Sequence, residues 1–150
     1  MSITNEITNK IAVGSLGKVH HIALNVSNME NSRHFYGNIL GLHELTGSEV
    51  PSTLKELVQE GKVTNFRTPD GTIIDLFYQP DFLPPHPDPK KEFTRVHHLA
   101  FDIAPELFDH AVSVLKYNQI IIDHGPVTRP TGRGIYFYDP DGLIIEIRCN

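Results

Sequence analysis

The sequence has too little cysteine for a disulfide scaffold. Among its 150 residues only Cys149 is a cysteine, so no disulfide can form within one chain. No apolar run approaches the ~20 residues that a membrane-spanning helix needs, and no basic block offers a surface to nucleic acid. Residues 1–18 lack the apolar core of a signal peptide. We therefore expect a cytoplasmic protein with neither a membrane nor a nucleic acid as partner.

The remaining composition is that of a packed globular protein. Hydrophobic residues make up 39% and charged residues 21% of the chain, and the net charge is −5. A chain of this length can bury a sizeable core as one domain. Nine histidines are many for this size, and their positions indicate more than their number.

Two blocks of sequence occur twice, in the same order. Residues 19–26, VHHIALNV, recur as VHHLAFDI at 96–103, and PDGTIID at 69–75 recurs as PDGLIIE at 140–146. The first copy holds extra chain between its blocks, which we place at 52–60. Thr53 and Glu56 have capping-box spacing there, and the apolar pattern predicts a short helix. This helix is either a lid over a site or a surface element that packs on the fold.

The repeat predicts two modules of equal design in an α+β fold, each built as strand, helix and three strands. We place an N-terminal arm at 1–17 before a single domain at 18–149. Module one covers 18–79, a proline-rich linker 80–92, and module two 93–149. The expected strands are 18–26, 42–49, 62–68, 72–79, 95–103, 120–123, 134–138 and 143–148, and the expected main helices are 28–40 and 105–117.

Strand alternation places three potential metal ligands on polar sheet faces. His21 and His98 occupy equivalent positions in the two modules, opposite an apolar face that packs on a helix. Glu146 takes the corresponding face of the last strand. Two histidines and one carboxylate form a set that binds divalent metals with open coordination positions. The alternative is that each is an ordinary structural residue, as we expect for His20 and His97.

Four further residues are candidates for the same site. Asp75 is the repeat equivalent of Glu146, so it is a fourth ligand, a hydrogen-bond partner or a general base. Tyr136 lies on the strand beside Glu146 and either donates to a bound oxyanion or fills the cleft. Arg129 and Arg133, in an expected loop near Tyr136, are placed to clamp a carboxylate or phosphonate, unless the loop is simply solvated.

Three segments carry a resemblance to a known family: HHIALNVSNMENSRHFYGNILGL at 20–42, VHHLAFDI at 96–103 and IYFYDPDGLIIEI at 135–147. The chain resembles the vicinal oxygen chelate superfamily, which includes glyoxalase I, extradiol dioxygenases, fosfomycin-resistance enzymes and bleomycin-binding proteins. The resemblance implies paired βαβββ modules that form an eight-stranded half-barrel around one divalent metal ion (Fe, Zn, Ni, Mn or Co). The implied ligands are His21, His98 and Glu146, and the implied assembly is a homodimer.

The function implied first is glyoxalase-like lyase or isomerase chemistry on a small metabolite that chelates the metal through adjacent oxygens. Asp75 or Glu146 would then move the proton. The alternatives are an Fe(II) extradiol-type dioxygenase, a fosfomycin-type resistance enzyme and a drug-binding protein. Asn25 stands at a substrate-binding position where glyoxalase I usually has an arginine for glutathione.

Overall fold

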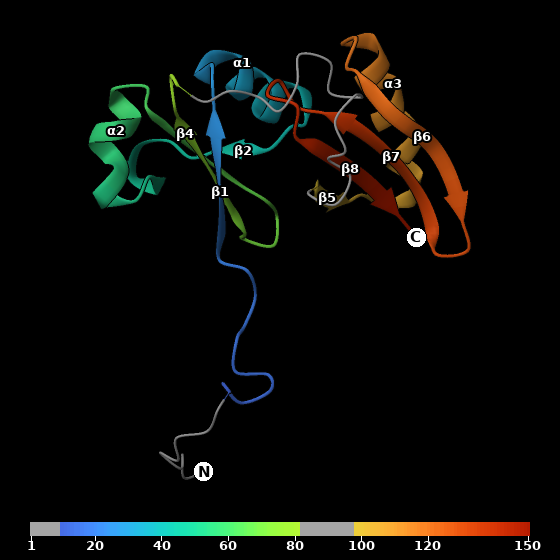
Figure 1. The fold of residues 1–150 in the computed structure, drawn as a ribbon, viewed down its shortest axis with the longest axis horizontal. Helices are drawn as coiled ribbons and strands as arrows, with labels where there is room; N and C mark the ends of the chain where they lie inside the picture. Colours follow the sequence, from blue (N-terminus) through green and yellow to red (C-terminus); the bar gives the residue numbers. More distant parts are fainter. Residues whose placement is uncertain (1–9, 82–97) are drawn as a thin grey trace.

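The computed structural model describes residues 10–81 and 98–150, and it contains the two expected modules (Figure 1). Most of the proposed linker and the first nine residues of the arm lie outside the described residues. In module one the strands and α-helices are β1 His21–Val26, α1 Met29–Arg33, β2 His43–Glu44, α2 Lys55–Gln59, β3 Val63–Arg67 and β4 Ile73–Tyr78. In module two they are β5 His98–Asp102, α3 Phe108–Tyr117, β6 Ile122–Arg129, β7 Gly132–Tyr138 and β8 Ile144–Cys149.

Each module forms its own four-stranded sheet, with the order β1-β4-β3-β2 in the first and β5-β8-β7-β6 in the second. The first strand of each module runs parallel to the last one, and the other neighbours are antiparallel. The α+β fold with two βαβββ modules is therefore confirmed. β1 and β5, which carry the repeated histidines, are edge strands of two different sheets.

Several expected elements differ in extent. The strand predicted at 42–49 is short, because Gly47 has a φ of +57° and a 3₁₀ turn, Gly47–Glu49, replaces its second half. The strand predicted at 120–123 instead runs to Arg129, and β7 begins at Gly132. The loop that we expected around Arg129 is thus a β-hairpin.

The first helix, predicted from residue 28, begins at Met29. Asn28 is its N-cap, and its side-chain oxygen accepts the backbone N–H of Asn31 at 3.0 Å. After α1 the helical backbone continues as a π-helical turn, His34–Ile39, and Gly41 follows with a φ of +73°. This segment carries the buried aromatic residues Phe35 and Tyr36 into the core.

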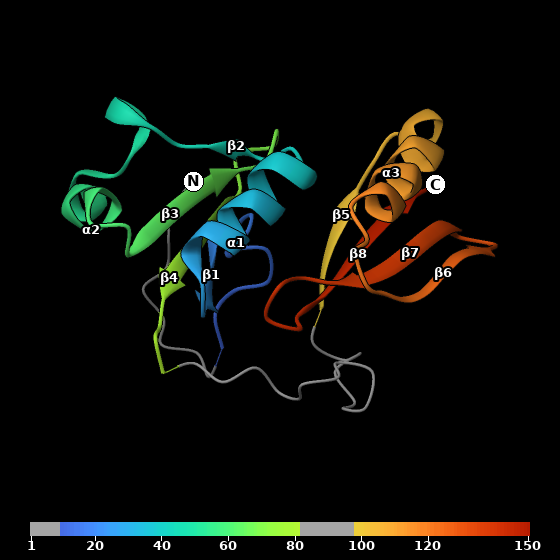
Figure 2. The ribbon, with the colours of Figure 1, turned by 90° about the horizontal axis from the view of Figure 1, so that it is seen from above.

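One hydrophobic core joins the helix-facing sides of both sheets. Figure 2 shows α1 on the side of module one that faces module two, while α3 covers the second sheet. Phe35 from module one and Phe137 from module two meet there, with ring centroids 6.2 Å apart. The core residues with at most 1% exposure are Val26, Tyr36, Phe66, Ile74, Leu76, Phe108, Leu115, Ile135, Phe137, Ile145 and Cys149. The opposite faces of the sheets are left to carry the polar residues.

The extra chain of module one contains the predicted helix, made of a 3₁₀ turn, Ser52–Leu54, and α2. The capping box predicted at Thr53 is wrong, because no side chain caps α2. The capping box of this segment is formed instead by Thr46 and Glu49. Glu49 accepts the backbone N–H of Thr46 at 3.2 Å. α2 contacts β3. Its role as a lid stays a prediction.

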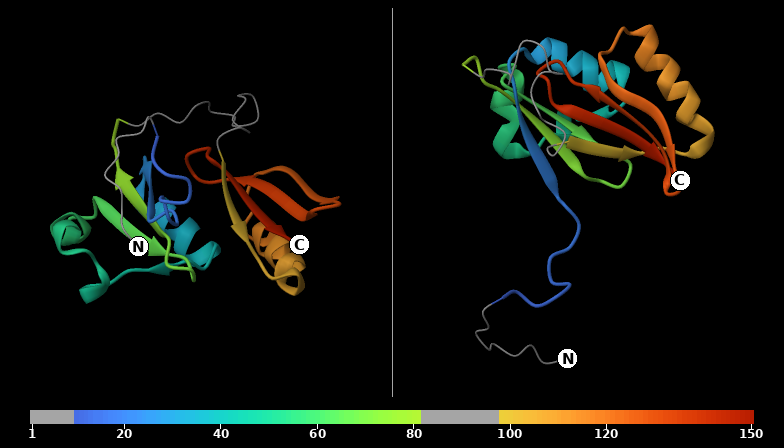
Figure 3. Two further views of the ribbon diagram at one scale, coloured as in Figure 1. Left: turned by 90° about the horizontal axis from the view of Figure 1, so that it is seen from below. Right: turned by 45° about the vertical axis from the view of Figure 1, so that its right-hand side comes forward.

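Residues 10–20 leave the body of the molecule as an extended segment (Figures 1 and 3). Lys18 attaches the end of this segment to module one, because its Nζ donates a 2.9 Å hydrogen bond to the carbonyl oxygen of Asp70. In the described part of the chain, no helix combines the length and apolar character needed to cross a membrane.

Candidate metal and substrate site

The second sheet aligns the candidate residues in one row across its strands. Backbone register pairs Ala100 of β5 with Glu146 of β8, Glu146 with Tyr136 of β7, and Tyr136 with His124 of β6. His98 lies two residues before Ala100 and therefore shares its face. The alternate β7 residues point into the core on the other side. The face away from α3 is consequently the polar one.

His98 and Glu146 come together at one end of this row. Nε2 of His98 lies 3.3 Å from Oε1 of Glu146, and their side chains are 32% and 12% exposed. Metal–ligand bonds of ~2.0–2.2 Å place two neighbouring donors of one cation roughly 3 Å apart. Imidazole nitrogen and carboxylate oxygen are also donors that divalent metals accept. The pair therefore fits two adjacent positions of one metal ion.

Tyr136 is the centre of an aromatic cluster beside this pair. The His98 ring meets it edge-on with centroids 6.0 Å apart, and the His124 ring is stacked on it at 4.1 Å with an interplanar angle of 12°. Nη1 of Arg129 donates to the Tyr136 hydroxyl at 3.4 Å, and its guanidinium lies 5.8 Å from the ring centroid. The phenol and the guanidinium thus lie together, where an anionic group could be bound.

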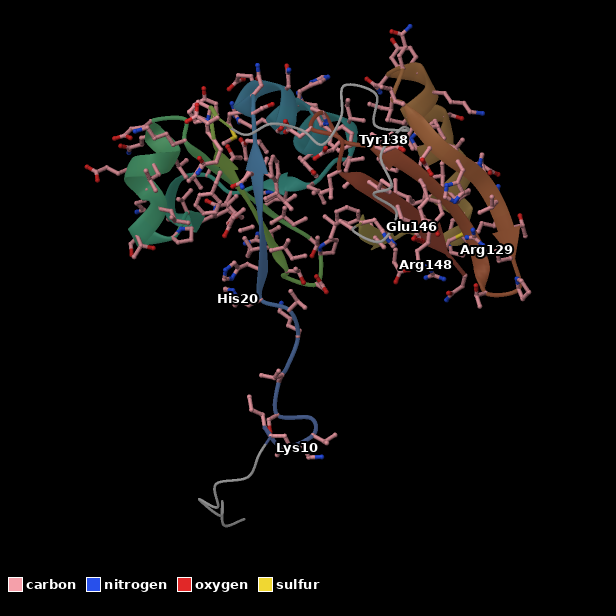
Figure 4. The ribbon with its side chains drawn as sticks, in the orientation of Figure 1. Lys10, His20, Arg129, Tyr138, Glu146 and Arg148 are labelled. Atoms are coloured by element: carbon pink, nitrogen blue, oxygen red, sulfur yellow. The ribbon has the colours of Figure 1, made fainter. Side chains whose placement is uncertain are left out.

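His21 is not part of this cluster. It begins β1, the edge strand of the other sheet, and its Nδ1 lies 2.9 Å from Nδ1 of His20. Figure 4 shows His20 at the foot of β1, well separated from Glu146 on β8. Among residues 10–81 and 98–150, no three histidine, cysteine or acidic side chains are grouped closely enough to hold a metal. One chain therefore assembles two of the three predicted ligands.

Module one repeats the row with different residues. Ala23 of β1 pairs with Asp75 of β4, and Asp75 pairs with Asn65 of β3. Asp75 is buried, and its Oδ1 accepts a 2.6 Å hydrogen bond from Nδ2 of Asn65. Asn65 is also buried, and its own Oδ1 has no partner among the described residues. Asp75 is thus held by a neighbouring amide on the face that His21 shares.

The remaining predicted substrate-binding residues lie in different surroundings. Asn25 is exposed on β1, on the same face as His21. Arg133 was expected near Tyr136 in a loop, but it lies on β7 and faces α3. Its Nη2 donates to Asp109 at 2.8 Å, and its guanidinium lies 4.4 Å from the Phe108 ring centroid. We correct that expectation, because Arg133 points away from the Tyr136 face.

Two residues of this face were missed by the sequence analysis. His124 was not among the candidates, yet it lies on β6 against Tyr136, with Asp123 next to it. Asn65 was not considered at all. Its position in a strand, where amides are uncommon, was the available signal.

Comparisons with known proteins agree with the fold. The family model described as Glyoxalase/Bleomycin resistance protein/Dioxygenase superfamily matches residues 18–147. The metallothiol transferase FosB of Staphylococcus epidermidis is 31% identical over 131 residues, which cover 86% of this chain and 79% of that protein. Among solved structures, a glyoxalase/dioxygenase from Nostoc punctiforme is 66% identical, with a TM-score of 0.89 over 97% of this chain and 99% of that chain. The fosfomycin resistance protein FosX from Listeria monocytogenes is 25% identical, with a TM-score of 0.63 over 91% of each chain.

Proposed function

Because this chain belongs to the glyoxalase/bleomycin resistance protein/dioxygenase superfamily, we propose that it is a metal-dependent enzyme acting on a small molecule. The substrate would bind through two adjacent oxygens, and the reaction would be of the lyase or isomerase class. The observation that carries the proposal is the convergence of His98 and Glu146 on one polar sheet face, beside Tyr136.

The third ligand in this proposal is His21 of a second copy of the chain. β1 and β5 are sheet edges, and edge strands present unpaired backbone N–H and C=O groups that favour pairing with another strand. Alanines, Ala23 and Ala100, occupy equivalent exposed positions on these edges, so two strands can approach there. β1 of one copy beside β5 of another would join two sheets into the expected eight-stranded half-barrel. A symmetric homodimer would then contain two such sites.

Within this site the residues of the chain have distinct tasks. A divalent cation held by His21, His98 and Glu146 would act as a Lewis acid on the substrate oxygens. Arg129 and the Tyr136 hydroxyl would bind a negatively charged substrate group by charge-assisted hydrogen bonds. Asp75 would come from the same copy as His21 and serve as base or hydrogen-bond partner.

Metal content tests this proposal directly. Protein purified without added metal should contain about one divalent ion per chain, and His98→Ala and Glu146→Gln should both lose it. His110→Ala is the matched control, because His110 is exposed on α3, behind the second sheet. Full metal content in both ligand variants would refute the site. Iron in the purified protein would favour the dioxygenase alternative over the lyase or isomerase.

A second candidate function is fosfomycin-type resistance. It is favoured by the 31% identity to FosB and by Arg129 beside Tyr136, a pair suited to a phosphonate. Incubation of the metal-loaded protein with fosfomycin, with and without a thiol, distinguishes the two. Opening of the fosfomycin epoxide by wild-type protein, but not by a variant without Arg129, would support the resistance function. An unchanged epoxide would leave the first proposal in place.

A further inference from the structure

β6 carries a carboxylate–imidazole pair that the proposed function does not use. Nδ1 of His124 lies 2.6 Å from Oδ2 of Asp123, and their side chains are 29% and 9% exposed. The Tyr138 hydroxyl donates to Oδ1 of the same carboxylate at 2.5 Å. Tyr138 of the neighbouring strand β7 therefore fixes the carboxylate of Asp123, and this carboxylate fixes the imidazole of His124.

A bulge in β6 turns His124 toward the site. Ile122 pairs with Phe137, and His124 pairs with Tyr136, so two steps along β6 correspond to one step along β7. Ile122 packs against the core, and in a regular strand His124 would follow it to the same side. The extra residue, Asp123, reverses that alternation. Bulges of this kind are frequent beside active sites, where they change the direction of a side chain.

The orientation of the ring leaves one nitrogen available. When Asp123 accepts the Nδ1–H, Nε2 becomes the unprotonated, accepting nitrogen of the neutral imidazole. Stacking on Tyr136 occupies a face of the ring and not its edge. The hydrogen bond and the ion pair of His124 with Asp123 both use Nδ1, so neither engages Nε2. His124 is therefore oriented as a base.

The distance between His124 and the pair formed by His98 and Glu146 suits a bound substrate. His124 is separated from Glu146 by one strand, β7, which places their backbones roughly 10 Å apart at the usual strand spacing. Both side chains project from the same face, so the gap between them matches a molecule about one ring wide. A substrate chelated at Glu146 and lying over Tyr136 would reach Nε2.

We infer that His124 is the residue of this site that accepts the proton of a substrate hydroxyl. A hydroxyl of the chelating substrate gives its proton to Nε2, and the electron pair of the broken O–H bond stays on the substrate oxygen. Asp123 stabilises the resulting imidazolium through the Nδ1 hydrogen bond, as carboxylates do in catalytic dyads. Among the described residues, the ring is stacked on Tyr136, Arg129 lies beyond Tyr136, and Tyr138 contacts the carboxylate of Asp123. The inference rests on the proposed function, because the substrate is the one held at His98 and Glu146.

Proton counting tests the inference without knowledge of the substrate. The probe is 4-nitrocatechol, whose two adjacent hydroxyls chelate metals and whose second hydroxyl is protonated at neutral pH. The protein is loaded with Zn²⁺, which has no redox chemistry. Calorimetry in two buffers of different ionisation enthalpy then gives the number of protons released to the buffer per bound probe. Wild-type protein should retain the proton, whereas His124→Gln should release about one more per probe.

Two further variants complete the experiment. His110→Gln, behind the sheet, should release as few protons as the wild-type protein. Asp123→Asn, which leaves the imidazole in place but removes its charged partner, should also increase the release. Equal release from wild-type, His124→Gln and Asp123→Asn protein would overturn the inference while leaving the metal site intact. Failure of the wild-type protein to bind the probe would instead contradict the proposed function.

Discussion

Tyr36 donates a hydrogen bond to Asp139 across the junction of the two modules, with 2.7 Å between its hydroxyl and Oδ2. Tyr36 is fully buried, and the other oxygen of Asp139 accepts the backbone N–H groups of Asp141 and Leu143. Burial raises the pKa of Asp139 above its ordinary value, although its hydrogen bonds oppose the shift. Burial and the nearby carboxylate raise the pKa of Tyr36 as well. This single contact therefore links the stability of the two-module core to pH.

Removal of the Tyr36 hydroxyl should weaken the junction. Tyr36→Phe leaves the buried Oδ2 of Asp139 without its donor, and the free energy of unfolding should fall by about 1–3 kcal/mol. Urea denaturation measures this loss. Tyr117→Phe is the control, because Tyr117 is 88% exposed and its change should stay within ~0.5 kcal/mol. Equal stability of the two variants would show that the bond contributes nothing.

The raised pKa of Asp139 predicts the direction of a pH effect. A group whose pKa is higher in the folded state contributes stability below its unfolded value of about 4, and loses that contribution as pH rises through the folded value. Asp139→Asn cannot ionise, so the difference in unfolding free energy between wild type and variant isolates this group. Relative to the variant, the wild-type protein should be less stable at neutral pH than at pH ~4. An opposite slope would contradict the assignment.

Asp75 and Glu146 are repeat equivalents with different expected roles. We predict that Asp75→Asn keeps the metal, because its side chain is engaged by Asn65 and the Asn65 donor retains an acceptor in the variant. Glu146→Gln should lose the metal, because the carboxylate beside His98 is removed. Metal analysis of the two purified variants gives the answer. Metal loss in Asp75→Asn would make Asp75 a fourth ligand.

The repeats in the sequence were sufficient to predict the modules and the polar faces of their strands. The two Pro-Asp-Gly turns precede β4 and β8, and the second histidine of each His-His pair begins β1 or β5. Alternation along the last strand correctly separated Glu146 from the core residue Ile145. These features depend on neighbours within one strand or turn, so local patterns encode them.

The errors arise where pairing between strands decides the outcome. The prolines and glycines at 125–134 indicated a loop, but pairing of β6 with β7 extends both strands through it. If residues 132–138 are taken as one strand, side chains alternate between its two faces, and Arg133 falls on the face opposite to Tyr136. The direction of His124 depends on a bulge, which local sequence does not reveal. The separation of His21 from His98 depends on which sheet edges meet, and no pattern within a strand specifies that.

The central claim is that two copies of the chain complete each metal site. Two differently tagged chains test it when they are co-expressed, one with His21→Ala and the other with Glu146→Gln, and the mixed dimer is purified through both tags. Each variant alone should lack the metal. The mixed dimer should regain about half of the wild-type metal content, because one of its two shared sites has all three ligands intact. A mixed dimer without metal, or full metal content in His21→Ala protein alone, would contradict the account.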